Sequence, residues 1–241
     1  MNNSLAGKHV VILGGSSGIG FAIAQTAHAH GAYVHIASRS RDKLLRAADS
    51  IGRGVQIYSA DITDEASVKK MFHSFESIDH VIVTASNVQL GAIIDTDCAD
   101  LKATLDSRFW GSYYAAKYAA PLMKGTGSIT FMSGTSTWKP SPGGAVAAAS
   151  GAAVESLGRS LALELSPLRV NTISAGAIDT PLLDTFFGKN RAEVIEQLKN
   201  TLPVKRMGKP EDVAEAALFL MKNQYTTGTV LSVDGGILLT S

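Results

Sequence analysis

A glycine-rich segment near the amino terminus, GGSSGIG at residues 14–20, has the composition of a phosphate-binding loop. It follows the apolar run HVVIL at residues 9–13 and opens a segment of helical character. Glycine lets a backbone turn sharply and approach a ligand closely, and the start of the helix offers unpaired N–H groups to a phosphate. The alternative is a tight turn without a ligand. Its position after a first buried strand favours dinucleotide binding.

The residues after the next apolar run predict which dinucleotide binds. A NAD-binding loop of this kind is followed, about 20 residues later, by an acidic residue that binds the ribose hydroxyls. Here the segment is IASRSRDKL, with Arg39 and Arg41 present and no acidic residue before Asp42. A guanidinium pairs with a 2′-phosphate through two hydrogen bonds. We therefore expect NADP(H) to be preferred over NAD(H), the alternative being a solvated basic turn ahead of an amphipathic helix.

Groups that could act on a substrate are few. The segment SGTSTW begins with Ser133 at the end of an apolar run, where α/β proteins bind ligands, and its hydroxyls are candidates to bind a substrate carbonyl. The alternative is a polar loop that satisfies its own backbone. Arg108 is a second candidate, either to stabilise a developing oxyanion or to form a salt bridge on its helix. His28 and His30 fall on different faces of a helix, so we expect no metal site.

Alternating strands and helices must position these groups. The predicted strands are residues 9–13, 32–37, 55–60, 80–85, 128–133, 168–174 and 230–236, and the longest predicted helices are 97–123 and 144–165. Strands that are apolar throughout indicate a parallel sheet covered on both faces. We predict the α/β class, with a single doubly wound Rossmann domain over residues 1–241 and a seven-stranded sheet flanked by helices. Residues 182–202 depart from this alternation and are predicted to form a substrate flap.

Composition excludes several classes of protein. The 241 residues fit one α/β domain, and the formal net charge of +1 comes without a basic or acidic run, so we expect no nucleic-acid or membrane partner. Cys98 is the lone cysteine and supports neither a disulfide framework nor a thiolate metal site. The first apolar run is far too short for a signal peptide or a membrane span. We expect a cytoplasmic protein with a small-molecule substrate.

Several motifs, taken in order, resemble the short-chain dehydrogenase/reductase family along almost the whole chain. GGSSGIG is similar to its TGxxxGIG cofactor loop, SADITD (59–64) to the segment that contacts adenine, and RVNTISAGAIDTP (169–181) to the segment that anchors the nicotinamide carboxamide. KPEDVAEAALFLMKNQYTTGTVLSVDGG is similar to its carboxyl-terminal signature. The resemblance, together with the glycine-rich segment and the basic segment at Arg39, predicts a cofactor site. Its residues are Gly14, Ser16, Ser17, Gly18, Ile19, Gly20, Ser38, Arg39, Ser40, Asp61, Ile62, Ala85, Ser86, Gly176, Ile178 and Thr180.

The catalytic residues usual in that family are missing from the positions that the resemblance assigns. These residues are an Asn in the long fourth helix, a Ser after the fifth strand, and a Tyr-x-x-x-Lys pair whose Tyr protonates the substrate oxygen. The matching positions hold Arg108, Gly134, Ala147 and Gly151, with Ser133 one residue before the Ser position. Small residues at 147 and 151 imply open space where the Tyr and Lys would stand.

Three functions remain open from the sequence. The first is an atypical NADP(H)-dependent oxidoreductase that reduces a quinone, an enone or another activated carbonyl, since such acceptors need no strong acid at oxygen. The second is a catalytically silent NADP(H)-binding sensor or partner subunit, and the third is a cofactor-assisted isomerase or cyclase. Tyr113 and Lys117 have the spacing of the missing pair, but they lie on the wrong helix for the family's active site. The resemblance also implies a homodimer or homotetramer.

Overall fold

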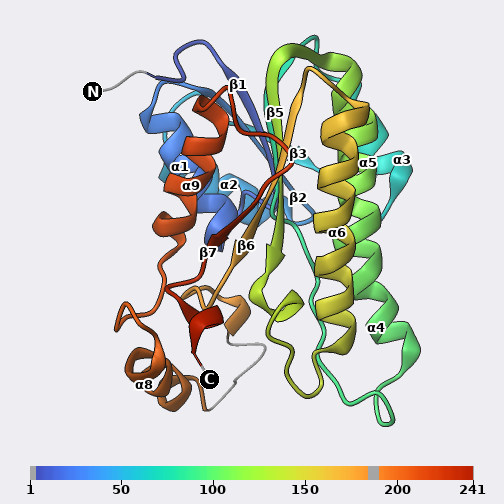
Figure 1. The fold of residues 1–241 in the computed structure, drawn as a ribbon. Helices are drawn as coiled ribbons and strands as arrows, with labels where there is room; N and C mark the ends of the chain where they lie inside the picture. The colour runs from blue at the N-terminus through green and yellow to red at the C-terminus, as the bar shows by residue number, and fades with distance from the viewer. Residues whose placement is uncertain (1–3, 184–189, 241) are drawn as a thin grey trace.

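The computed structural model describes residues 4–183 and 190–240, and within them one parallel sheet of seven strands forms the centre of the molecule (Figure 1). The strands are β1 (His9–Leu13), β2 (Tyr33–Ser38), β3 (Gln56–Ser59), β4 (Ile78–Val83), β5 (Met123–Gly134), β6 (Arg169–Ala175) and β7 (Val230–Val233). Their order is β3-β2-β1-β4-β5-β6-β7, and every neighbouring pair is parallel. The predicted doubly wound α/β fold is confirmed.

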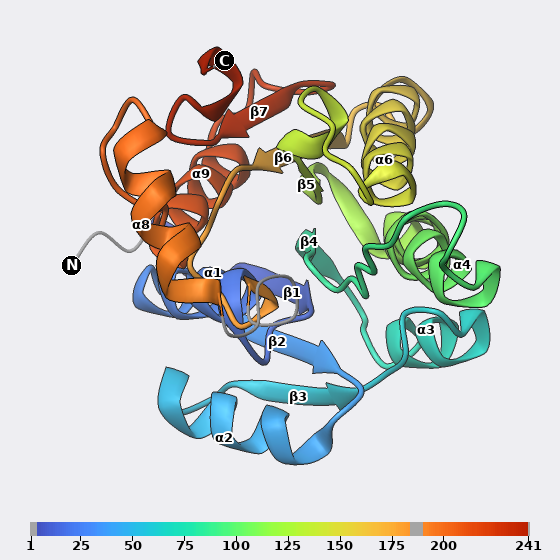
Figure 2. The ribbon, with the colours of Figure 1, turned by 90° about the horizontal axis from the view of Figure 1, so that it is seen from below.

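Helices cover both faces of this sheet, as Figure 2 shows from the edge where the strands end. One layer holds α1 (Gly18–Ala29), α2 (Arg41–Ile51) and α9 (Pro210–Lys222), and the other holds α3 (Glu65–Phe72), α5 (Gly111–Ala119) and α6 (Ala145–Glu164). Alternate residues of β1 serve the two layers: Val10 and Ile12 pack in the first core, and Val11 and Leu13 in the second. This two-sided burial explains why the strands are apolar throughout.

The long helix expected over residues 97–123 is interrupted. Helix α4 (Cys98–Leu105) passes through a π-helical segment, Asp106–Trp110, before α5 begins. Serine side chains compete with the backbone here: Ser107 Oγ donates to Thr104 O at 3.2 Å, and Ser112 Oγ donates to Arg108 O at 2.6 Å. Such side-chain bonds to a preceding turn bend helices, and π-helical turns often mark functional sites. Arg108 lies in the middle of this segment.

The predicted flap, residues 182–202, is described only in part. Residues 184–189 lie outside the described residues, and the rest contains α8 (Arg191–Thr201). Arg191 forms an ion pair with Asp179, which lies in the segment after β6. This contact fastens the start of α8 beside the carboxyl ends of the strands.

Across residues 4–183 and 190–240, no helix combines the length and apolar character that crossing a lipid bilayer would require.

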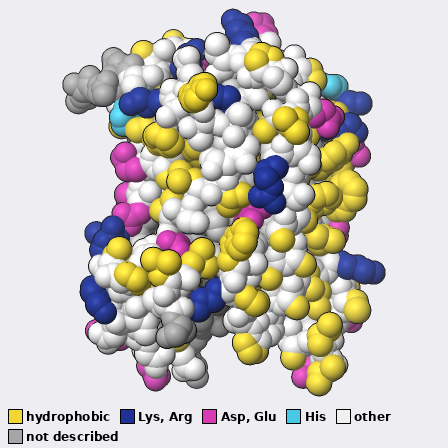
Figure 3. Space-filling model, in the orientation of Figure 1, with side chains coloured by type: hydrophobic (Ala, Val, Ile, Leu, Met, Phe, Trp, Pro, Cys, Tyr) yellow, Lys and Arg dark blue, Asp and Glu magenta, His cyan; other side chains and the backbone are white. Residues whose placement is uncertain are grey.

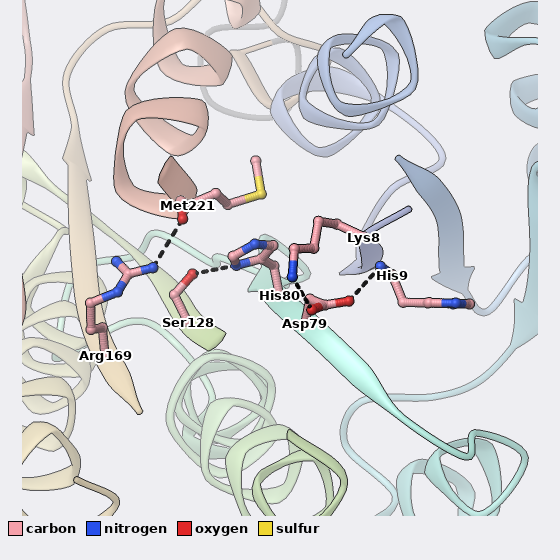
Figure 4. A network of polar contacts seen from close by, with 7 residues as sticks. All are labelled: Lys8, His9, Asp79, His80, Ser128, Arg169 and Met221. Carbon is pink, nitrogen blue, oxygen red and sulfur yellow. Dashed lines mark hydrogen bonds and ion pairs between the residues drawn. The ribbon is translucent and has the colours of Figure 1, made fainter. Parts of the chain in front are cut away.

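A polar network joins the amino-terminal ends of the strands, at the edge opposite the ends of β1 and β4 where the glycine loop begins (Figure 4). Lys8 Nζ and Asp79 Oδ1 form an ion pair at 2.8 Å, and His9 N donates to Asp79 Oδ2 at 2.9 Å. His80 Nδ1 and Ser128 Oγ lie 2.8 Å apart, within hydrogen-bond distance. These contacts tie β1, β4 and β5 together and lie far from the edge where ligands bind in this fold class.

The buried His80 makes stability depend on pH. Burial lowers the pKa of His80 from 6.5 to about 4, while the unfolded chain titrates near 6.5. The unfolded state therefore binds the proton first, and stability is lost as the pH falls from 6.5 towards 4. Urea unfolding at pH 7 and pH 5 should show a smaller loss of stability in His80→Gln than in the unmodified protein, by about 2 kcal/mol. Equal losses in the two proteins would contradict this account.

Candidate cofactor and substrate site

A cavity of about 670 Å³ opens at the carboxyl ends of the strands, around the point where the strand order reverses between β1 and β4. Ligands of doubly wound folds bind at this point. The cavity wall contains all the residues that the sequence assigned to a cofactor together with both catalytic candidates: Gly14, Ser16, Ser17, Gly18, Ile19, Gly20, Ser38, Arg39, Ser40, Asp61, Ile62, Ala85, Ser86, Arg108, Ser133, Gly176, Ile178 and Thr180.

The glycine loop leaves no space for side chains. Gly14 has a φ of +95°, and a Cβ on it would stand 2.6 Å from the backbone nitrogen of Ala85. A Cβ on Gly20 would stand 2.3 Å from the carbonyl oxygen of Gly14. Helix α1 begins at Gly18, and within the described structure the side chain of Ser17 makes no capping hydrogen bond. The first N–H groups of α1 are therefore free to bind a phosphate, so the loop fits a dinucleotide.

A basic corner, formed by Arg39 and Lys43, lies at the end of β2. Arg39 is exposed on the cavity wall, and Ser59 Oγ donates to its carbonyl at 3.2 Å. Ser40 caps α2 by accepting from Lys43 N at 3.3 Å, which brings Lys43 to the same wall. Lys43 and Arg46 also line a hollow beside Ser17. Sequence reasoning missed Lys43, although its place three residues after a capping serine puts it in the helix turn that faces the cavity.

The loop after β3, beside this corner, is fixed by hydrogen bonds and packing. Asp61 Oδ1 accepts from Thr63 N at 2.9 Å and from Thr63 Oγ1 at 2.8 Å, which holds the loop after β3 in one shape. Ile62 is 8% exposed, and a Cβ on Gly111 would lie 2.6 Å from its Cγ1. Helix α5 thus approaches closely enough to press Ile62 into the cavity wall, where an adenine ring would need an apolar contact.

The space expected beside Ala147 and Gly151 is filled. A Cβ on Gly151 would stand 2.7 Å from Thr137 Cγ2 and 3.7 Å from Arg108 Nη1. Arg108 Nη1 donates to the carbonyl of Ala147 at 3.1 Å. The guanidinium of Arg108 therefore lies against the α6 turn that carries both positions. The sequence expectation of open space is wrong here, because neighbouring side chains from two other segments occupy it.

Arg108 is the strongest electrostatic feature of the site. Burial lowers the pKa of its guanidinium to about 10, so it remains protonated at neutral pH. Its Nε is buried and, among the described residues, has no hydrogen-bond partner. The salt bridge weighed as an alternative is absent from residues 4–183 and 190–240. A guanidinium on a cavity wall, with its positive charge retained, is suited to bind a carbonyl oxygen or an oxyanion.

Ser133 lies at the end of β5, 5% exposed, on the same wall. Its Oγ donates to Glu155 Oε1 at 2.7 Å, and Thr137 Oγ1 donates to the same oxygen at 3.1 Å. Glu155 lies one turn beyond Gly151 on α6 and is 2% exposed. Among the described residues, Thr135 and Ser136 do not line the cavity. Sequence reasoning did not find Glu155, because nothing in its local pattern distinguishes it from a solvated helix residue.

The alternative pair of Tyr113 and Lys117 lies elsewhere. Lys117 Nζ pairs with Glu65 Oε1 at 2.7 Å, and Tyr113 packs edge-on against Trp110 with ring centres 5.8 Å apart. Neither belongs to the cavity wall in the described part of the chain. The geometry therefore gives this pair no part in the site. Further wall residues that the sequence did not indicate are Leu13, Ala37, Lys43, Ala60, Thr63, Thr84, Asn87, Ala103, Ser107, Met132, Ala175, Pro181, Leu182 and Leu183.

Comparisons with known proteins agree with this arrangement. A family model described as enoyl-(acyl carrier protein) reductase matches residues 14–238. A curated relative, the short-chain dehydrogenase/reductase malC of Malbranchea aurantiaca, is 34% identical over 253 residues, which cover 98% of this chain and 96% of the relative.

Two solved structures are similar over nearly their full length. The MalC reductase/Diels-Alderase of Malbranchea aurantiaca has a TM-score of 0.92 at 33% identity, covering 99% of each chain. A small-chain dehydrogenase in complex with NADPH has a TM-score of 0.84 at 35% identity, covering 97% of this chain and 99% of the other. Similarity of this extent covers the sheet, both helix layers and the cavity.

Proposed function

This chain belongs to the short-chain dehydrogenase/reductase family, and on that premise we propose that it is a cytoplasmic NADP(H)-dependent oxidoreductase of small organic substrates. Its substrates are activated acceptors, such as a quinone, an enone or an activated ketone. One observation carries this proposal: the protonated Arg108 lies on the cavity wall against Ala147, at the α6 turn where the family's usual acid and its lysine would stand. Relatives that carry the name of reductase support the general class.

The cofactor part of the proposal rests on the fit of the loop and the basic corner. Gly14 and Gly20 let the loop pack tightly on the end of β4 and on itself, and the start of α1 supplies N–H donors to a pyrophosphate. Arg39 and Lys43 supply positive charge for a 2′-phosphate. When bound, the reduced cofactor supplies a hydride to the substrate.

Arg108 takes the place of a general acid in this scheme without giving up a proton. As negative charge grows on the substrate oxygen, the positive charge of the guanidinium stabilises it. The proton then comes from water after the reducing step. This route serves acceptors whose reduced form is a stabilised anion, such as a hydroquinone or an enolate.

Cofactor preference is tested by titration. NADPH should quench or enhance the protein's fluorescence at lower concentration than NADH, and Arg39→Ala should erase that difference. Loss of a bidentate, charge-assisted contact corresponds to a factor of about ten or more in affinity. Lys43→Ala should weaken NADPH binding more modestly, because a lysine acts as a point charge without the planar fork. Equal affinities for NADPH and NADH in the unmodified protein would refute the assignment.

The proposed activity is tested by following NADPH absorbance with a panel of quinones, enones and activated ketones. Sustained oxidation of NADPH with any of them supports an oxidoreductase. Tight NADPH binding without turnover on any of them would favour the silent sensor or partner subunit.

A second function has its own support. The arrangement around Ala147 and Gly151 offers a hydrogen-bond donor in Arg108 but no phenolic acid, and the similar MalC protein is described as a reductase and Diels-Alderase. A guanidinium bound to a carbonyl withdraws electrons from a conjugated alkene, which assists a cycloaddition without consuming cofactor. Conversion of a tethered diene and enone without a change in NADPH absorbance would identify this cyclase activity.

Self-association is proposed through the helices on one flank. Hydrophobic side chains gather over the α4–α6 side of the molecule in Figure 3. Trp110 is 42% exposed, and Leu105 and Tyr113 are each 37% exposed along α4, the π-helical segment and α5. An apolar, aromatic surface of this kind is typical of subunit interfaces. Sedimentation velocity measures whether the chain is a homodimer or homotetramer.

A further inference from the structure

The hydroxyl of Ser133 has a fixed polarity. It carries one hydrogen, and that hydrogen is donated to Glu155 Oε1 over 2.7 Å. What remains for the cavity is the lone pairs of the oxygen. Ser133 therefore faces a ligand as a hydrogen-bond acceptor, in contrast to the donor role that its position first suggested.

Glu155 enforces this polarity. Glu155 Oε1 accepts the hydrogen of Ser133, and Thr137 Oγ1 adds a second donor to the same oxygen. Glu155 is 2% exposed and, within the described part of the chain, is paired with no lysine or arginine. Turning the Ser133 hydroxyl away would leave this buried carboxyl oxygen with one donor fewer, which is unfavourable.

The cavity wall is therefore polarised. Arg108 offers N–H donors, and Ser133, whose hydrogen is donated to Glu155, offers an acceptor. Both side chains lie around Gly151, since a Cβ there would stand 3.7 Å from Arg108 Nη1 and 3.8 Å from Ser133 Cβ. A ligand that satisfies both must present an oxygen acceptor and a donor close together.

We propose that Ser133, held by Glu155, accepts a hydrogen bond from a substrate N–H while Arg108 binds the oxygen of the ketone that is reduced. The substrate class is a nitrogen-containing carbonyl compound, such as a lactam that carries an adjacent ketone. A hydroxyl group can rotate to meet either a donor or an acceptor, whereas a lactam N–H is a fixed donor. A lactam N–H therefore matches the acceptor of Ser133 and cannot turn to present an acceptor in its place. This inference rests on the proposed function for its reducing step but concerns recognition.

Isatin and N-methylisatin form a matched pair of probes, because the methyl group removes the N–H and leaves both carbonyls. 5-Methylisatin controls for the added volume. Calorimetry on the complex with NADP⁺ measures binding without turnover, and NADPH absorbance measures reduction. In that reduction hydride adds to the C3 carbon, the C=O π electrons move to oxygen, and the oxygen takes a proton from water to give the secondary alcohol.

The unmodified protein should bind isatin and 5-methylisatin about tenfold more tightly than N-methylisatin, as expected for loss of one hydrogen bond in a buried site. Ser133→Ala should bring the ratio to about one. Glu155→Gln keeps the shape, but its amide N–H₂ can donate to Ser133 and free the serine hydrogen to point into the cavity. The ratio should then fall to about one or below.

Thr137→Val is the matched control, since it removes the second donor to Glu155 and keeps the methyl group that contacts Gly151. It should retain the tenfold ratio, and melting curves show whether each variant is folded. The proposal is overturned if the unmodified protein binds isatin and N-methylisatin equally, if it binds neither, or if the preference survives in Ser133→Ala. A preference in binding without NADPH oxidation supports this recognition and rejects the oxidoreductase function.

Discussion

Arg108→Met is expected to lower kcat/KM for NADPH-dependent reduction by about 10²- to 10³-fold, the usual loss when one donor to a developing oxyanion is removed. NADPH affinity should change little, because the pyrophosphate loop and the basic corner lie on other segments of the cavity wall. Stopped-flow or steady-state assays with the best acceptor from the panel measure the first quantity, and fluorescence titration measures the second.

The stability of Arg108→Met should not fall with its activity. Among the described residues, the guanidinium of Arg108 donates one hydrogen bond, to the carbonyl of Ala147, and burial disfavours its charge. Methionine has a similar length and carries no charge to desolvate, and replacing buried charges by apolar side chains is often neutral or stabilising. We expect an unchanged or higher melting temperature. Arg108→Lys keeps the positive charge but loses the planar guanidinium, so its activity should lie between those of the unmodified protein and Arg108→Met. A large loss of stability in Arg108→Met would show that the residue serves the fold instead.

Gly14→Ala is expected to weaken NADPH binding by about 100-fold or more. A Cβ at this position would stand 2.6 Å from Ala85 N and 2.9 Å from Ala85 Cα, both backbone atoms, at a φ of +95°. Relief requires β1 and β4 to separate, or the loop to leave the phosphate position. Overpacking and an alanine in the left-handed conformation together cost about 2 to 5 kcal/mol. The loop reduces this cost by moving out of its phosphate-binding geometry, and NADPH affinity falls as a result.

Gly54→Ala is the control that introduces the backbone strain of a positive φ without a steric clash. Gly54 also has a positive φ, +88°, but among the described atoms nothing lies within 4 Å of a Cβ there. It lies in the turn before β3, far along the chain from the glycine loop. This variant should lose about 1 to 2 kcal/mol of stability and keep its NADPH affinity. If both variants bound NADPH like the unmodified protein, the close approach at Gly14 would have no part in cofactor binding.

The fold could be predicted because its determinants are local and repeated. Strands are short apolar runs and helices have an amphipathic period, so β1 at His9–Leu13 falls on the predicted strand 9–13 and α6 at Ala145–Glu164 on the predicted helix 144–165. The cofactor wall could be predicted for the same reason. A glycine loop, the end of the second strand and the segment after the sixth strand all carry their chemistry in consecutive residues.

The substrate side could not be predicted, because its contacts join residues far apart in sequence. Arg108 reaches Ala147 across 39 positions, and Ser133 reaches Glu155 across 22. Small side chains at 147 and 151 say nothing about which neighbour fills the space beside them. The π-helical segment could not be predicted for a different reason. Serine side chains that donate to the preceding turn accompany it, and serine also occurs in ordinary helices.

The contact between Thr137 and the α6 turn also limits how this protein can change. A lysine at position 151 would meet the methyl group of Thr137 at 2.7 Å from its own Cβ and would place a second cation beside Arg108. Placing the family's usual lysine at this position thus requires accommodating substitutions at Thr137 and Arg108. Redesign towards ordinary ketone reduction must therefore begin at these two side chains, before the pair itself is introduced.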